Sequence, residues 1–232
     1  KFKKVVLSRK ETIIEKDINV VKTFTKLLNT YDNAFVYVWF HPKVGLWMGA
    51  TPETLIKINK KSFETMSLAG TQVCKTNKQV YWKAKEIDEQ QLVTDYVLQK
   101  LKVICRTVKA SKVETIKAGN LLHLKTIIKG NFSNNTSELI KVLHPTPAVC
   151  GYPKDVTKNF IIENEGYDRA FYTGFLGEIN MPKSELYVNL RCMEIYKKEL
   201  SIYVGGGITK ESVPLKEWEE TVAKSEIMKR VL

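Results

Sequence analysis

The alternation of short strand patterns with a few helical stretches most constrains the fold of this chain. Strand patterns are predicted at residues 5–7, 34–40, 44–48, 54–58, 62–67, 121–129, 173–179, 185–193 and 200–204. Helical periodicity is predicted at residues 19–28, from 79 to about 108, in a short segment ending near 143, at 155–163 and at 214–231. Residues 144–153 contain several prolines and are expected to form no regular element. Strand pairs and meanders interleaved with few helices predict an α+β fold, with largely antiparallel sheets packed together and helices outside.

Composition narrows the class of protein. With 232 residues, 44% hydrophobic and 27% charged, the chain can bury a core, and we expect one domain over 1–232. Its apolar runs are far shorter than the roughly 20 residues of a membrane helix, so no membrane partner is expected. Four isolated cysteines without metal-ligand spacing indicate reduced thiols and a cytoplasmic protein.

The net charge of +12 raises the question of a nucleic-acid partner. The lysines are spread along the whole chain, and no nucleic-acid-binding motif stands out. We therefore predict no nucleic-acid partner. The same positive charge would instead attract a small dianionic substrate.

The last quarter of the chain predicts an anion site. Arg191 falls on a predicted strand, and its planar guanidinium suits a carboxylate. The run 205–207 is three glycines, whose backbone N–H groups can approach an anion that side chains would block. Glu217, Glu220 and Lys224 are spaced to share one helix face. Two acids and a base beside an anion cradle indicate a small polycarboxylate held partly through a divalent metal.

Seven segments, in this order, resemble the chorismate-utilising enzymes. They are 4–9 (K-V-V-L-S-R), 49–53 (G-A-T-P-E), 68–71 (L-A-G-T), 86–93 (E-I-D-E-Q-Q-L-V), 143–153 (L-H-P-T-P-A-V-C-G-Y-P), 190–192 with 205–208 (L-R-C and G-G-G-I), and 217–224 (E-W-E-E-T-V-A-K). The resemblance covers essentially the whole chain. It implies the chorismate-binding fold.

Three positions distinguish between the different enzymes of that family. Lys4 stands where isochorismate and salicylate synthases place a general-base lysine, and where anthranilate synthases usually carry glutamine. Ala69 stands where aminodeoxychorismate synthases tend to place a lysine nucleophile. The H-P-T-P sequence within 144–153 favours isochorismate synthase over salicylate synthase. The resemblance thus implies an isomerase that converts chorismate to isochorismate for menaquinone or siderophore biosynthesis.

The resemblance also implies catalytic roles. Lys4 would be the base that activates water, and it would need a lowered pKa. Glu53 would be the acid that protonates the leaving hydroxyl, which requires a raised pKa. Glu89 and Glu220 would hold Mg2+, with Glu86 and Glu217 as acceptors for metal-bound water.

Further residues are candidates for binding the two carboxylates of chorismate. The resemblance implies Arg191, Gly205 and Tyr172 for the pyruvyl carboxylate and Lys224 and Thr71 for the ring carboxylate. Gly70, Gly206 and His123 are further candidates for substrate binding. Four converging glutamates would repel one another without a cation, so we expect the metal to be integral to an ordered site.

Two departures from the family leave alternatives open. Relatives carry well over a hundred residues before the K-V-V-L-S-R strand, so the chain is expected to lack an N-terminal segment. Asp88-Glu89-Gln90 stands where glutamate followed by histidine is common. Salicylate synthase, which continues from isochorismate by eliminating pyruvate, and a truncated, non-catalytic chorismate-binding domain remain alternatives. A monomer is expected.

Overall fold

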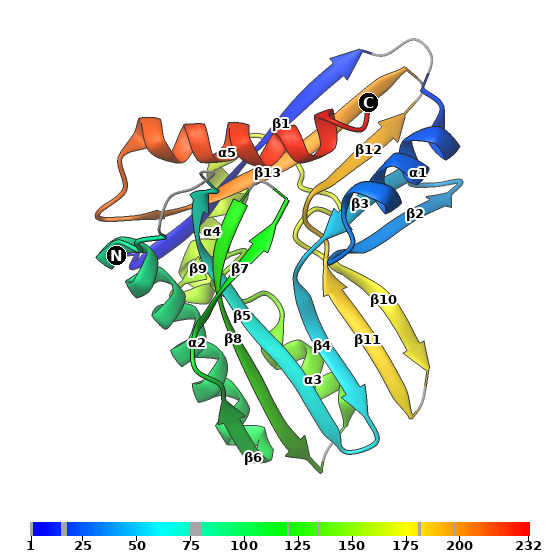
Figure 1. Ribbon diagram of the computed structural model, residues 1–232. Coiled ribbons are helices and arrows are strands. Elements are labelled where there is room, and N and C mark those ends of the chain that lie inside the picture. Colours follow the sequence, from blue (N-terminus) through cyan, green and yellow to red (C-terminus); the bar gives the residue numbers. More distant parts are fainter. Residues whose placement is uncertain are drawn as a thin grey trace.

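The computed structural model describes residues 2–14, 18–74, 80–119, 121–133, 135–180, 182–196 and 198–232. These residues form two antiparallel sheets with helices packed against them (Figure 1). Within these ranges, no helix is both long and apolar enough to cross a membrane. The predicted fold class, antiparallel sheets with outer helices, is confirmed.

Sheet A contains the first and the last strands of the chain. In the described residues its order is β2-β3-β12-β13-β1-β9, with bounds Phe35–His41, Gly45–Thr51, Cys192–Tyr196, Glu199–Thr209, Lys4–Ile14 and Gly151–Tyr152. The long pairing of β1 with β13 sets Lys4 opposite Thr209 and Leu7 opposite Gly206. Lys4 also pairs with Tyr152 of β9, so β1 lies between two strands at its start.

Sheet B is built from the middle of the chain. Its described strands follow the order β10-β11-β4-β5-β8-β6, and β7 also pairs with β8. The bounds are Phe175–Asn180, Lys183–Val188, Thr54–Asn59, Ser62–Val73, Leu121–Phe132, Cys105–Ala110 and, for β7, Glu114–Ala118. The register of β5 with β8 places Thr71 opposite His123.

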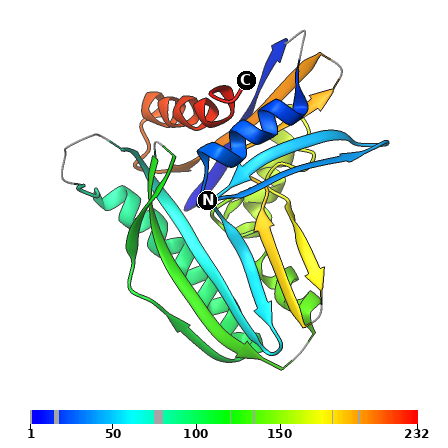
Figure 2. The same ribbon diagram turned by 45° about the vertical axis from the view of Figure 1, so that its right-hand side comes forward.

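The helices cover the two sheets and bury separate apolar clusters. They are α1 (Val20–Thr30), α2 (Ala84–Ile104), α3 (Thr136–Leu143), α4 (Lys154–Asn164) and α5 (Pro214–Lys229). Helix α5 lies across β13, and α2 runs along β5 and β8 (Figures 1 and 2). Leu101 of α2 belongs to the core of sheet B, whereas Met228 near the end of α5 belongs to that of sheet A. The site lies where the two sheets meet.

Three predicted elements need correction. The helix predicted from 79 to about 108 ends at Ile104, and Gln79 lies outside the described residues. The residues after Ile104 form β6 against β8, and the β-branched Thr107 and Val108 at its centre favour this pairing. The 185–193 prediction is two strands, β11 and β12, which belong to different sheets. Within 144–153, Gly151 and Tyr152 pair with β1 although no regular element was expected.

Candidate active site

A pocket between the sheets collects most of the predicted site residues. Eleven of the fourteen predicted residues line it, namely Glu53, Gly70, Thr71, Glu89, His123, Tyr172, Arg191, Gly205, Gly206, Glu220 and Lys224. Glu86 and Glu217 line a neighbouring groove that shares Thr71 and Glu220 with the pocket. Lys4 lies beneath Gly207, another lining residue, since a Cβ built on Gly207 would fall 2.7 Å from Lys4 Cε. The structure therefore brings all fourteen into one region.

Lys4 is held at the start of β1 and is almost entirely buried, with 1% of its surface exposed. Its Nζ lies 2.9 Å from Oε1 of Glu89, which projects from α2. Burial raises the pKa of Glu89, but the charges of Lys4, Lys224 and Lys85 and the hydrogen bond from Lys4 together outweigh this and leave the pKa below its ordinary value. The Lys4 side chain is thus held against the Glu89 carboxylate in the structure.

Glu53 follows Pro52 in the link between β3 and β4, and it is buried. Its backbone is fixed on both sides, because Val188 N–H donates to its carbonyl at 2.9 Å and its own N–H donates to Thr51 Oγ1 at 3.3 Å. Burial raises the pKa of Glu53 to about 7, against the opposing charges of Lys4, Arg191 and Lys224. A carboxyl group in this state can hold and donate a proton near neutral pH.

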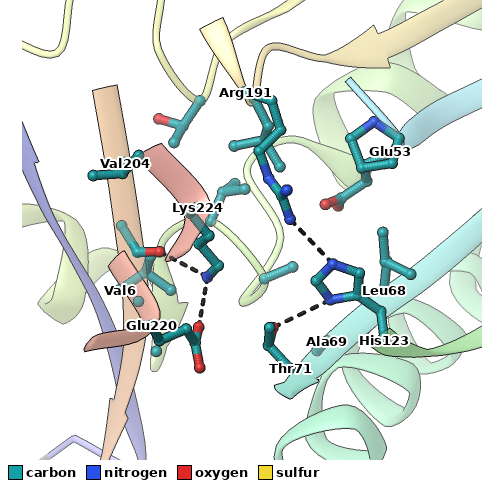
Figure 3. Close-up of a pocket in the computed structure, with 18 of the residues that line it drawn as sticks. Val6, Glu53, Leu68, Ala69, Thr71, His123, Arg191, Val204, Glu220 and Lys224 are labelled. Atoms are coloured by element: carbon teal, nitrogen blue, oxygen red, sulfur yellow. Dashed lines mark hydrogen bonds and ion pairs between the residues drawn. The ribbon is translucent and has the colours of Figure 1, made fainter. Parts of the chain in front are cut away.

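His123 on β8 links Arg191 to Thr71 (Figure 3). Arg191 Nη2 lies 3.1 Å from His123 Nε2. Because a guanidinium only donates, Nε2 accepts and the ring proton lies on Nδ1, 3.1 Å from Thr71 Oγ1. Burial, together with the charge of Arg191, lowers the pKa of His123 well below its ordinary value. The imidazole is therefore neutral and orients the arginine.

Arg191 occupies the turn between β11 and β12, and not a strand as the sequence predicted. Its backbone φ is +49°, a conformation that residues other than glycine seldom adopt. Ala50 N–H donates to its carbonyl at 3.0 Å, and the buried Asn189 two residues earlier donates from Nδ2 to Phe171 O at 2.8 Å. Burial lowers the pKa of Arg191 to about 10, so the guanidinium stays charged at neutral pH. The chain crosses between the sheets here, and this aims a cation into the pocket.

The glycine run on β13 allows three segments to approach closely. A Cβ on Gly205 would lie 2.8 Å from the Leu7 carbonyl oxygen and 3.0 Å from Tyr172 Oη. On Gly207 it would lie 2.5 Å from Glu89 Oε1. Tyr172 is buried and stacks on Tyr203 with 5.7 Å between ring centroids. Backbone and phenol thus form one wall of the pocket, as an anion cradle requires.

Lysines neutralise three of the four predicted metal-site glutamates. Besides the pair of Lys4 and Glu89, Lys224 Nζ lies 2.6 Å from Glu220 Oε1 and donates to Gly205 O at 2.8 Å (Figure 3). Lys85 forms an ion pair with the buried Glu217. The expected repulsion between glutamates is thus relieved by the lysines of the chain.

The donor chemistry nevertheless fits magnesium. Across the described ranges, no three His, Cys, Asp or Glu side chains converge as a ready-made metal cluster. Glu89 and Glu220, however, project from α2 and α5 into the same pocket. Carboxylate oxygens are the ligands that Mg2+ prefers, and this ion retains several waters, so two direct carboxylates are enough.

Two polar contacts near the site were missed from the sequence. Lys85 was not singled out, because its partner Glu217 lies far along the chain. Arg169 was missed as well, although it donates to the carbonyls of Val6 at 2.7 Å and Val149 at 3.1 Å, two residues that line the pocket. No local sequence signal marks either contact.

Comparison with known proteins places the chain among chorismate-utilising enzymes. Isochorismate synthase DhbC of Bacillus subtilis (strain 168) is 33% identical over 198 residues, which cover 80% of this chain and 50% of that protein. The vibriobactin-specific isochorismate synthase of Vibrio cholerae is 32% identical over 243 residues, which cover 99% of this chain and 61% of that protein. A solved structure from Bacillus anthracis, assigned as the 2,3-dihydroxybenzoate-specific isochorismate synthase DhbC, superposes with a TM-score of 0.91 at 29% identity, covering 99% and 66%.

The chain thus spans between half and two thirds of the length of these relatives. The sequence profile of a family described as chorismate binding enzyme matches residues 1–232. Together with the pocket of buried acid, neutral histidine and convergent cations, this match leads to one conclusion: the chain belongs to the chorismate-binding enzyme family.

Proposed function

We propose that this chain carries the active site of an isochorismate synthase, which converts chorismate to isochorismate. Water adds at C2 of the ring while the C4 hydroxyl leaves as water, so the reaction is an isomerisation. The observation that carries the proposal is Glu53, a buried carboxyl group in the pocket whose pKa is raised to about 7. The names and identities of the relatives support the same activity.

Glu53 is proposed as the general acid. Below about pH 7 its carboxyl group keeps the proton that the departing C4 hydroxyl needs. It lies on the side of the pocket that holds Arg191 and His123, and Lys224 and Glu220 lie across from it (Figure 3). With Glu53 as the acid on this side of the pocket, the C4 hydroxyl would leave toward Glu53.

Lys4 is proposed as the general base that takes a proton from the attacking water. In the structure its ammonium is engaged by Glu89 at 2.9 Å. The lysine must lose this contact and its proton before it can accept one from water. Its position at the start of β1, fixed by β13 on one side and β9 on the other, keeps the amine beneath the glycine run.

The remaining charged groups are proposed to bind the two carboxylates of chorismate. Arg191, the N–H groups of the glycine run at Gly205 and Gly206, and Tyr172 would take the pyruvyl carboxylate. Lys224, Thr71 and the Gly70 backbone would take the ring carboxylate, and His123 would hold Arg191 and Thr71 in place. Their convergence in one pocket supports this assignment.

Glu89 and Glu220 are proposed to hold Mg2+, with Glu86 and Glu217 accepting hydrogen bonds from its waters. When bound, the ion would neutralise the ring carboxylate and fix its position. We also propose a cytoplasmic monomer that acts on a small molecule without a nucleic-acid or membrane partner. Light scattering during size exclusion would check the oligomeric state.

The proposal is tested by incubating the chain with chorismate and Mg2+ and resolving products by chromatography with mass detection. The expected result is isochorismate from the parent, and a rate of formation lower by about two to four orders of magnitude in Lys4→Ala and in Glu53→Gln. Salicylate with pyruvate would assign the chain to salicylate synthase instead. Chorismate binding without any product would make the chain a non-catalytic binding domain.

A further inference from the structure

Lys85 is a charged residue beside the site that the proposed chemistry does not use. It lies in the first turn of α2, which begins at Ala84. The N-terminus of a helix carries partial positive charge, so a lysine there is electrostatically unfavourable unless something else holds it. A nearby carboxylate would offset this cost.

That carboxylate is Glu217 in the first turn of α5. The side chains of Lys85 and Glu217 are only 20% and 7% exposed. Helix α2 packs against sheet B and α5 against β13 of sheet A, so this ion pair spans the junction of the sheets. The charges of Glu89 and Glu220 also act favourably on the Lys85 ammonium. One lysine thus stands in the field of three carboxylates.

These carboxylates are the ones at which a divalent cation is proposed to bind. Lys85 and Glu217 line the groove that shares Thr71 and Glu220 with the pocket. A divalent cation at Glu89 and Glu220 would therefore place two further positive charges near the Lys85 ammonium. Like charges in a partly buried region repel strongly.

We propose that Lys85 is an internal counter-cation that competes with a divalent cation for the carboxylates of α2 and α5. Without the cation, Lys85 neutralises Glu217 and holds the two helices together. With a divalent cation held by Glu89 and Glu220, Lys85 would be repelled from Glu217, whose carboxylate would then be free to accept hydrogen bonds. This inference rests on the proposed function, because it takes Glu89 and Glu220 as the ligands.

The test measures Mn2+ binding to the 232-residue chain without chorismate, by electron paramagnetic resonance of the free ion. Lys85→Gln removes the competitor, so its Mn2+ affinity is expected to rise by about fivefold or more. Lys85→Arg keeps the charge and is expected to stay close to the parent. Lys216→Gln is the matched control, because Lys216 is an exposed lysine that lines the same groove. Its affinity is expected to change by less than about twofold.

Thermal unfolding gives a second measurement that separates competition from a structural ion pair. Lys85→Gln should melt below the parent without Mg2+, because Glu217 is left buried and unpaired. Addition of Mg2+ should raise the Tm of Lys85→Gln by more than it raises the Tm of the parent. Equal Mn2+ affinity in parent and Lys85→Gln, with an equal Tm deficit at all Mg2+ concentrations, would overturn the inference alone. Absence of Mn2+ binding in every variant would overturn both this inference and the proposed metal site.

Discussion

At the scale of single residues, burial sets the protonation states around the pocket. Glu53 is buried among cations and still keeps a raised pKa of about 7, because loss of water outweighs their attraction. His123 is neutral for the complementary reason, since Arg191 donates to it and burial disfavours its charged form. An acid that holds its proton and a histidine that cannot gain one give the pocket a fixed pattern of donors and acceptors before any substrate arrives.

This pattern predicts a pH-dependent stability that Glu53→Gln removes. The pKa of Glu53 is about 7 in the folded state, against an ordinary value of 4.5, so the folded protein binds the proton more tightly than the unfolded chain does. Stability is therefore greatest below about pH 4.5 as far as this group is concerned, and it falls as pH rises to about 7. Glu53→Gln has no such penalty, so its Tm relative to the parent should rise between pH 5 and about pH 8. Thermal melts at four pH values measure this.

Glu178→Gln is the control for that series, because Glu178 is an exposed carboxylate on β10. Its Tm difference from the parent should stay constant over the same range. A Glu53→Gln difference that is also constant would show that Glu53 ionises normally and would remove the basis for its role as the acid. Isochorismate formation by Glu53→Gln should fall by about two to four orders of magnitude.

At the scale of elements, strand β13 predicts three different outcomes for three adjacent alanine substitutions. A Cβ at Gly205 meets the backbone of β1, with Leu7 O at 2.8 Å, so Gly205→Ala should cost about 1–3 kcal/mol of unfolding free energy. At Gly206 the nearest atoms are 3.8 Å away, so Gly206→Ala should leave stability nearly unchanged. Gly207→Ala meets only the ends of the Glu89 and Lys4 side chains, which can move.

Gly207→Ala should therefore remain folded while the pair of Lys4 and Glu89 is displaced. Urea unfolding of the three variants measures their stability. Product formation from chorismate measures whether displacement of Lys4 in Gly207→Ala impairs the reaction. Equal losses of stability at Gly205 and Gly206 would contradict the close approach of β1 to β13. Full activity in Gly207→Ala would argue against Lys4 as the base.

The sequence predicts those helices and strands whose apolar residues recur with a regular period. It fails where pairing with a distant segment determines the structure. Helix α1 and the strands β4 and β5 carry enough local pattern to be recognised. The apolar run 185–193 looks like one strand, because nothing local marks the point where the chain passes from sheet B to sheet A. Arg191 was thus identified as a site residue, but its backbone was assigned to the wrong element. The pairing of Lys85 with Glu217 depends on the packing of two helices and has no local signal.

At the scale of the whole molecule, Arg169 joins three separate segments behind the pocket. It donates to the carbonyls of Val6 on β1 and Val149, and its Nε donates to Glu165 at 2.7 Å. The Glu165 side chain is only 3% exposed, and it also accepts from Ser8 N–H at 2.8 Å. Arg169→Gln leaves this carboxylate buried without its cation, so we expect a loss of about 3–5 kcal/mol in unfolding free energy.

Lys57→Gln is the matched control, because it removes the same charge from a half-exposed ion pair with Glu185. It should change the unfolding free energy by no more than about 1 kcal/mol. Urea denaturation compares the two variants directly. A similarly small effect of Arg169→Gln would show that the three segments are held by packing and not by the arginine.

The pairing of β1 with β13 also governs when the pocket can form during synthesis. Lys4 pairs with Thr209, so β1 is made well before the strand that becomes its longest partner. Until then β1 lacks its longest partner, and neither the glycine run nor α5 exists to close the pocket. Strand pairing over such a separation is slow, on a scale of about milliseconds to seconds for domains rich in distant contacts. The pocket therefore cannot form on a growing chain until β13 and α5 have been made and β13 has paired with β1.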